Sequence, residues 1–173
     1  KDTLDPPGGE IVRDSKGNPT GVLIDNAMTL LEQHIPDADN AAKIRALQAA
    51  FKHLLALGIT SVHDAGVDTD VVKLYQQLAA EHKLPLRIYP MLSARDPQLP
   101  AWLEAGIIDD PTDFLDIRSV KIYGDGALGS RGAALIEPYS DKPEQKGLLV
   151  TQPDQLTQIM QLTIDAGFQT NVH

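Results

Sequence analysis

The sequence contains no cysteine, which excludes disulfide bonds and thiolate metal sites within it. Basic residues are also few: 15 Lys and Arg stand against 24 Asp and Glu, giving a formal net charge of −9. Nucleic acids and anionic membranes bind clustered positive charge, so neither is an expected partner. No apolar run approaches the roughly 20 residues of a membrane-spanning helix. Hydrophobic residues make up 42%, which is typical of a globular domain, and the cellular compartment stays open.

Strand-like and helix-like patterns of apolar residues alternate along most of the chain. A β-hairpin is predicted first, from Glu10–Asp14 and Thr20–Asp25 around a Gly/Asn/Pro turn. After Gly58, short apolar strands alternate with helical stretches, which predicts β-α-β units and a parallel sheet. The expected helices are Ala27–Gln33, Asn40–Leu57, Asp70–His82, Leu99–Ala105 and Pro153–Ala166, and the expected sheet strands are Ile59–His63, Leu86–Ser93, Ile117–Tyr123 and Phe168–His173.

One face of each predicted sheet strand becomes polar toward its carboxyl end. Because side chains alternate along a strand, such faces carry His63, Ser93, Lys121 or Tyr123, and His173 at the four strand ends. In a β/α barrel the active site lies at the carboxyl ends of the strands. The pattern therefore favours one shared polar site, although unrelated strand ends that reach solvent would produce the same pattern.

The glycines Gly124-x-Gly126-x-x-Gly129 follow a predicted strand and match the spacing of a dinucleotide-binding loop. That interpretation also requires a crossover helix at the third glycine and an acidic residue at the end of the next strand. Barely two turns separate Gly129 from Pro138, and Asp141 lies in a polar run. A dinucleotide-binding oxidoreductase is therefore the less favoured hypothesis.

Lys121 lies inside an apolar strand, where an ammonium group is costly to bury. It would form an ion pair with Asp125 or Glu137, or extend its amine to the strand end. A third possibility is a carbamate formed with CO2, whose oxygens bridge two metal ions. His173, on the neighbouring strand, carries a typical imidazole ligand.

The segment IRSVKIYGDGALGSRGAAL, together with GITSVHDAG and FQTNVH, resembles the amidohydrolase superfamily. More narrowly it resembles the family-3 amidohydrolases, a group that includes N-substituted formamide deformylases. The opening PPGGEIVRDSKGNPTGVLID is similar to the segment that these proteins place between the first two barrel strands. The resemblance extends over essentially the whole chain.

This resemblance implies a metal-dependent (β/α)8 barrel, of which the chain would supply about strands two to five with their helices. It implies C–N bond hydrolysis of a small amide, usually with zinc. Residues 1–26 would be a hairpin segment, residues 27–173 a partial barrel, and residues 124–150 an insertion. The implied site residues are Lys121 as a carboxylated metal ligand, His173 as a second ligand, and His63, Asp125, Gly126 and Arg131 as groups near the metal or substrate.

The resemblance implies further site residues that these 173 residues do not contain. A His-x-His pair is expected before residue 1, and a histidine and the general-base aspartate are expected beyond residue 173. The sequence thus predicts the middle of an enzyme, inactive by itself. The competing class is a non-catalytic α/β module. In either case the exposed sheet edges predict a homo-oligomer. Arg131 is also expected to form a surface ion pair.

Overall fold

The computed structural model describes residues 2–173, which form two compact units. One unit contains Ala38–Ile122 and Thr157–Val172. The other contains the segment that ends at Asp37, together with Tyr123–Leu156 and His173. No helix among the described residues is both long enough and apolar enough to cross a membrane.

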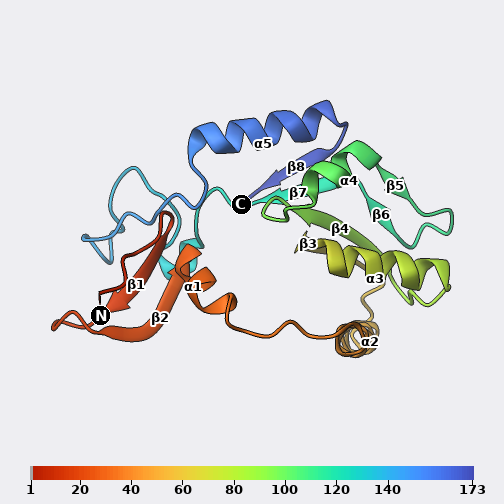
Figure 1. The fold of residues 1–173 in the computed structure, drawn as a ribbon, viewed down its shortest axis with the longest axis horizontal. Coiled ribbons are helices and arrows are strands. Elements are labelled where there is room, and N and C mark those ends of the chain that lie inside the picture. Colours follow the sequence, from red (N-terminus) through yellow and green to blue (C-terminus); the bar gives the residue numbers. More distant parts are fainter. Residues whose placement is uncertain (1) are drawn as a thin grey trace. The chain divides into compact units, whose positions relative to one another are not determined.

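The first of these units is built on a four-stranded parallel sheet with the strand order β3-β4-β7-β8 (Figure 1). Sequential strands are therefore neighbours, as repeated β-α-β units require. A two-stranded antiparallel sheet, β5-β6, lies in the connection between β4 and β7. The elements are α2 (Asn40–Ala56), β3 (Ser61–Val67), α3 (Thr69–Ala80), β4 (Arg87–Ser93), α4 (Leu99–Ala105), β5 (Ile108–Asp109), β6 (Asp116–Ile117), β7 (Ser119–Ile122), α5 (Pro153–Asp165) and β8 (Gln169–Val172).

The core of this unit lies on one face of the sheet, where apolar strand residues pack under helices. Val120 and Ile122 of β7 and Ile88 and Leu92 of β4 are at most 2% exposed. In α3 the buried side chains recur at helical spacing, which places one stripe of the helix against the sheet. They are Thr69, Val72, Leu74, Tyr75, Leu78 and Ala79.

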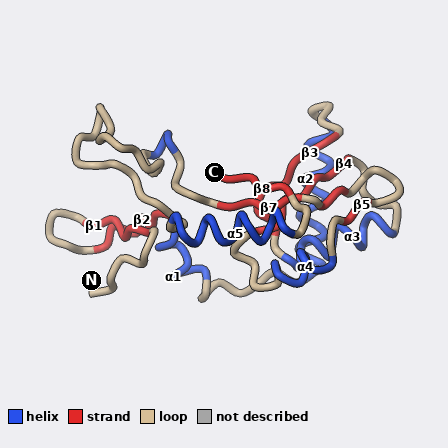
Figure 2. The backbone as a smooth tube through the Cα atoms, turned by 90° about the horizontal axis from the view of Figure 1, so that it is seen from above, coloured by secondary structure: helices blue, strands red, loops and turns tan. Residues whose placement is uncertain are grey.

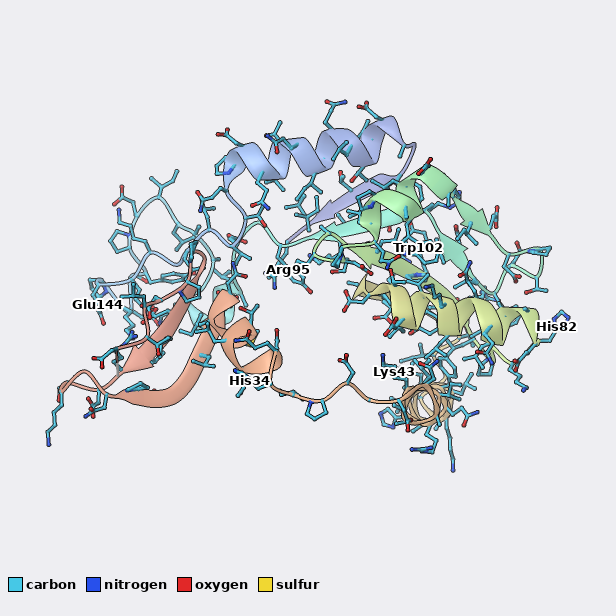
Figure 3. The ribbon with its side chains drawn as sticks, in the orientation of Figure 1. His34, Lys43, His82, Arg95, Trp102 and Glu144 are labelled. Atoms are coloured by element: carbon cyan, nitrogen blue, oxygen red, sulfur yellow. The ribbon has the colours of Figure 1, made fainter. Side chains whose placement is uncertain are left out.

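Polar contacts fix three helices of this unit. Asp39 caps α2 by accepting a hydrogen bond from the Ala42 amide. Lys43 of α2 forms an ion pair with Asp70 of α3 at 3.0 Å, and the Trp102 indole of α4 donates to Thr69 at 2.8 Å (Figure 3).

The second unit combines a hairpin with a long loop segment. Antiparallel strands β1 (Gly9–Arg13) and β2 (Pro19–Asp25) confirm the predicted hairpin, and two short helical turns follow. Residues 124–152 are almost entirely loop (Figure 2). The turns are η1 (Asn26–Met28), α1 (Thr29–Glu32) and, inside the loop, η2 (Leu128–Ser130).

Two predicted strands differ from the observed strands by more than one residue at an end. The strand predicted at Ile59–His63 begins at Ser61 and extends to Val67, because Gly66 adopts φ +95° and allows a bulge there. The run Ile117–Tyr123 divides at Arg118, since Ile117 pairs in the small antiparallel sheet whereas the next residues pair with β4.

Candidate functional site

Three polar residues form a row across the sheet face opposite the helices. Ser93 of β4 pairs with Lys121 of β7, and Lys121 pairs with Asn171 of β8. Paired residues of neighbouring parallel strands point to the same face. We call Ser93, Lys121 and Asn171 the polar row. It contains Lys121, the lysine that the sequence analysis proposed as a metal ligand.

The Lys121 side chain is half-buried, between strand neighbours that are almost fully buried. Its Nζ donates a hydrogen bond to the Ile122 carbonyl oxygen at 3.2 Å. Burial lowers the pKa of the Lys121 amine, because removal from water disfavours the ammonium form. A lowered pKa increases the neutral fraction, which is the nucleophilic form that reacts with CO2.

Two polar groups on this sheet face are buried without a hydrogen-bond partner within residues 2–173. They are the Asn171 Nδ2 and the Ser119 Oγ. Buried donors are normally satisfied, so each such group marks a position that a further group can fill. Alternation along β7 and β8 places both residues on the face of Lys121, but the sequence gives no sign that they are unsatisfied.

His63 is not at a strand end, contrary to the sequence prediction. It pairs with Tyr89, whereas the polar row lies at Ser93, four residues farther along β4. That separation corresponds to about 13 Å along the sheet. The exposed His63 ring stacks on Tyr89, with ring centroids 4.8 Å apart. The structure therefore brings Lys121, Ser93 and Asn171 together and leaves His63 apart from them.

His173 directly follows Val172, the last residue of β8, but it belongs to the unit that contains the long loop. Its carbonyl oxygen accepts a hydrogen bond from the Gly124 amide at 3.2 Å. Its exposed imidazole makes an edge-to-face contact with Tyr123, with ring centroids 5.8 Å apart. These contacts tie the candidate histidine to the beginning of the glycine-rich loop.

Asp125 and Gly126 shape this loop. The Asp125 carboxylate accepts a hydrogen bond from the Ala134 amide at 3.0 Å and thereby closes the loop on itself. Gly126 is buried, and a Cβ there would lie 2.9 Å from the Gly132 carbonyl oxygen. Only glycine fits at this position without displacement of the backbone.

Arg131 is held by a surface ion pair, as one of the two sequence interpretations predicted. Its guanidinium contacts both carboxylate oxygens of Asp141, with a shortest distance of 2.6 Å. The hydrogen bonds to Asp141 raise the pKa of Arg131 and lower that of its partner. The guanidinium is thus satisfied within the loop.

The dinucleotide hypothesis fails on the structure of the loop. A Rossmann-type loop opens a crossover helix at its third glycine. Here Gly129 lies inside the three-residue turn η2, and the next helix begins at Pro153.

The described chain contains candidate metal ligands but no assembled group of them. No group of three or more His, Asp or Glu side chains within residues 2–173 is arranged to hold an ion. Lys121 offers an amine of lowered pKa, and the β7–β8 register matches Ile122 with Val172, the residue before His173. The His173 imidazole is a typical metal donor, and Lys121 and His173 belong to different units.

Comparison with known proteins identifies relatives along the whole chain. The Amidohydrolase family matches residues 1–173. The putative amidohydrolase YtcJ of Bacillus subtilis is 33% identical over 178 residues, covering 100% of this chain and 33% of that protein. Protein LONG AFTER FAR-RED 3 of Arabidopsis thaliana is 30% identical, covering 99% of this chain and 31% of that protein. The chain thus spans about a third of the length of these two relatives.

A third relative and a solved structure agree with this placement. The N-substituted formamide deformylase of Arthrobacter pascens is 34% identical over 90 residues, which cover 50% of this chain and 17% of that protein. The crystal structure of an uncharacterized metal-dependent hydrolase from Pyrococcus horikoshii matches 93% of this chain and 33% of its own, with a TM-score of 0.72 and 27% identity.

Proposed function

Because the chain belongs to the amidohydrolase family, we propose that the protein is a metal-dependent hydrolase of C–N bonds in small amides of the N-acyl or N-formyl class. The observation that carries this proposal is Lys121, half-buried in the polar row with a lowered pKa. The proposal extends to the fold: the parallel sheet β3-β4-β7-β8 supplies about strands two to five of a (β/α)8 barrel.

In this proposal Lys121 and His173 are two ligands of a divalent metal site, with zinc the favoured ion. The neutral Lys121 amine attacks the carbon of CO2 and loses one proton, which leaves a carbamate with two oxygen donors. The His173 imidazole offers a nitrogen donor. When bound, a divalent metal ion supplies a water of lowered pKa and polarises the substrate carbonyl.

The remaining residues of the polar row orient Lys121. Asn171 and Ser93 lie on either side of it in register, and the Asn171 Nδ2 is a donor with no partner in residues 2–173. A carbamate is an acceptor, so in this proposal the Asn171 amide donates a hydrogen bond to it. The glycine-rich loop holds the backbone of His173 through Gly124.

Metal content and amide hydrolysis test the proposal together. Both are measured on this chain and on a form extended to the length of its relatives, with N-formyl and N-acyl amides as substrates. We expect metal and hydrolysis in the extended form, and loss of both on Lys121→Ala. An extended form that binds metal but hydrolyses no amide would contradict the substrate class and leave the metal site standing.

A further inference from the structure

Asp25, the last residue of β2, has a backbone conformation that non-glycine residues rarely adopt. Its φ is 49° and its ψ is −122°. These values resemble the first central position of a type II′ turn, where glycine is preferred. An aspartate there is strained relative to glycine, and strain of this kind often marks a functional position.

The neighbouring residue keeps Asp25 in this conformation. The Asn26 amide donates to the Gly8 carbonyl oxygen at 3.1 Å. The Asn26 side chain donates to the carbonyl oxygens of Pro7 at 2.9 Å and Val150 at 3.3 Å. Three hydrogen bonds donated by Asn26, two to the segment before β1 and one to the long loop, thus hold the residue that directly follows Asp25.

The Asp25 carboxylate lies against the glycine-rich loop. A Cβ built on Gly126 would come 2.8 Å from the Asp25 Oδ2, so the oxygen packs directly on that backbone. Asp25 precedes η1 but does not cap it through its side chain. Within residues 2–173 this half-buried carboxylate forms neither a hydrogen bond nor an ion pair.

The same loop connects Asp25 to the candidate ligand His173. The Gly124 amide donates to the His173 carbonyl oxygen, and Gly126, two residues later, contacts the Asp25 carboxylate. Two residues span at most about 7 Å. Asp25 therefore lies in the same unit as His173, and the short segment Gly124–Gly126 contacts both residues.

We propose that Asp25 is a substrate-binding residue, whose carboxylate accepts a hydrogen bond from the N–H group of the amide substrate. A carboxylate only accepts hydrogen bonds, and charge-assisted bonds are the stronger ones. This inference rests on the proposed amide hydrolysis and adds a substrate preference: N-monosubstituted amides, which carry an N–H, over N,N-disubstituted amides.

Asp25→Gly tests the inference sharply, because glycine suits the backbone conformation and removes only the carboxylate. In the metal-loaded extended protein, kcat/KM is measured for an N-monosubstituted formamide and its N-methylated counterpart. We expect Asp25→Gly to lower kcat/KM for the first by about tenfold or more and to change the second little. Asp25→Asn, which keeps an acceptor without the charge, should give an intermediate loss.

Asp113→Gly is the matched control. Asp113 also has a positive φ, 59°, but lies in the other unit, and its replacement should leave both values of kcat/KM unchanged. An unchanged ratio between the two substrates in Asp25→Gly overturns the inference, as does a loss of metal or a lower urea midpoint of unfolding in that variant. A wild-type protein inactive on both amides overturns the proposed function itself.

Discussion

Asn171 lies opposite Lys121 across the paired strands β7 and β8, and its buried Nδ2 has no hydrogen-bond partner in the described chain. Removing an unsatisfied buried polar group is close to neutral or stabilising, whereas removing a satisfied one is not. We expect Asn171→Leu to leave the urea midpoint of this chain unchanged or raise it. In the extended form the same change should reduce bound metal. A lower midpoint with normal metal content would contradict a role beside Lys121.

The Tyr75 hydroxyl of α3 donates a 2.6 Å hydrogen bond to Asp64 of β3. Burial, and then the bond to Asp64, raises the pKa of Tyr75 above its usual value of 10.0. A group with a raised folded-state pKa stabilises the fold below its unfolded pKa and loses that contribution as the pH rises.

The free energy of unfolding should therefore fall above about pH 10, and Tyr75→Phe should reduce that fall. Near neutral pH the substitution should cost about 1–3 kcal/mol, since Asp64 loses its donor. Urea unfolding of both proteins between pH 7 and pH 11 measures the difference. Parallel pH profiles for the two proteins would show that Tyr75 does not contribute.

Gly126→Ala should destabilise the unit that contains the long loop. The new Cβ would lie 2.8 Å from the Asp25 Oδ2 and 2.9 Å from the Gly132 carbonyl oxygen, and overpacking of this kind typically costs about 1–3 kcal/mol. Gly129→Ala is the control, because no atom lies within 4 Å of a Cβ there. Equal thermal midpoints for the two variants would contradict the close packing of the loop.

Arg131→Gln should leave KM unchanged for both neutral and anionic amides in the extended form. The guanidinium is held by Asp141 on the surface, and exposed ion pairs contribute little to stability. A rise in KM confined to anionic substrates would instead assign Arg131 to substrate binding.

We propose that this chain self-associates through the edge strands β3 and β8, each of which has one sheet neighbour in the described structure. Unpaired strand edges invite pairing, and a charged residue on an edge strand opposes it. Ala65→Lys on β3 should lower the mass measured by light scattering, and Ala80→Lys at the end of α3 should not. A monomeric wild-type chain at high concentration would refute this proposal.

The sequence predicted the order of strands and helices because apolar periodicity reports directly on burial. The predicted strand boundaries are wrong where tertiary contacts override the local preference of a residue for strand or loop. Asp and Gly are rare in strands, yet β3 continues through Asp64 and Gly66, since Tyr75 satisfies the carboxylate and a bulge accommodates the glycine. Strands of two residues, such as β5, show no periodicity.

The polar row was predictable in part. Alternation places Lys121 and Ser93 on one sheet face, and the observed register agrees. The Asn171 Nδ2 lacks a hydrogen-bond partner, and the backbone of Asp25 is strained. Both features depend on contacts between segments distant in sequence, so no local sequence pattern predicts them. The prediction that His63 lies at a strand end was wrong because β3 continues through Asp64 and Gly66 to Val67.

Metal content per chain in Lys121→Ala is the most direct test of the proposed metal site. It should be measured in the extended form beside the wild type, with Lys146→Ala, which changes an exposed lysine of the loop 124–152, as the control. The account predicts that bound metal is lost in Lys121→Ala and kept in the control. Wild-type metal content in Lys121→Ala would contradict the assignment of this lysine as a ligand.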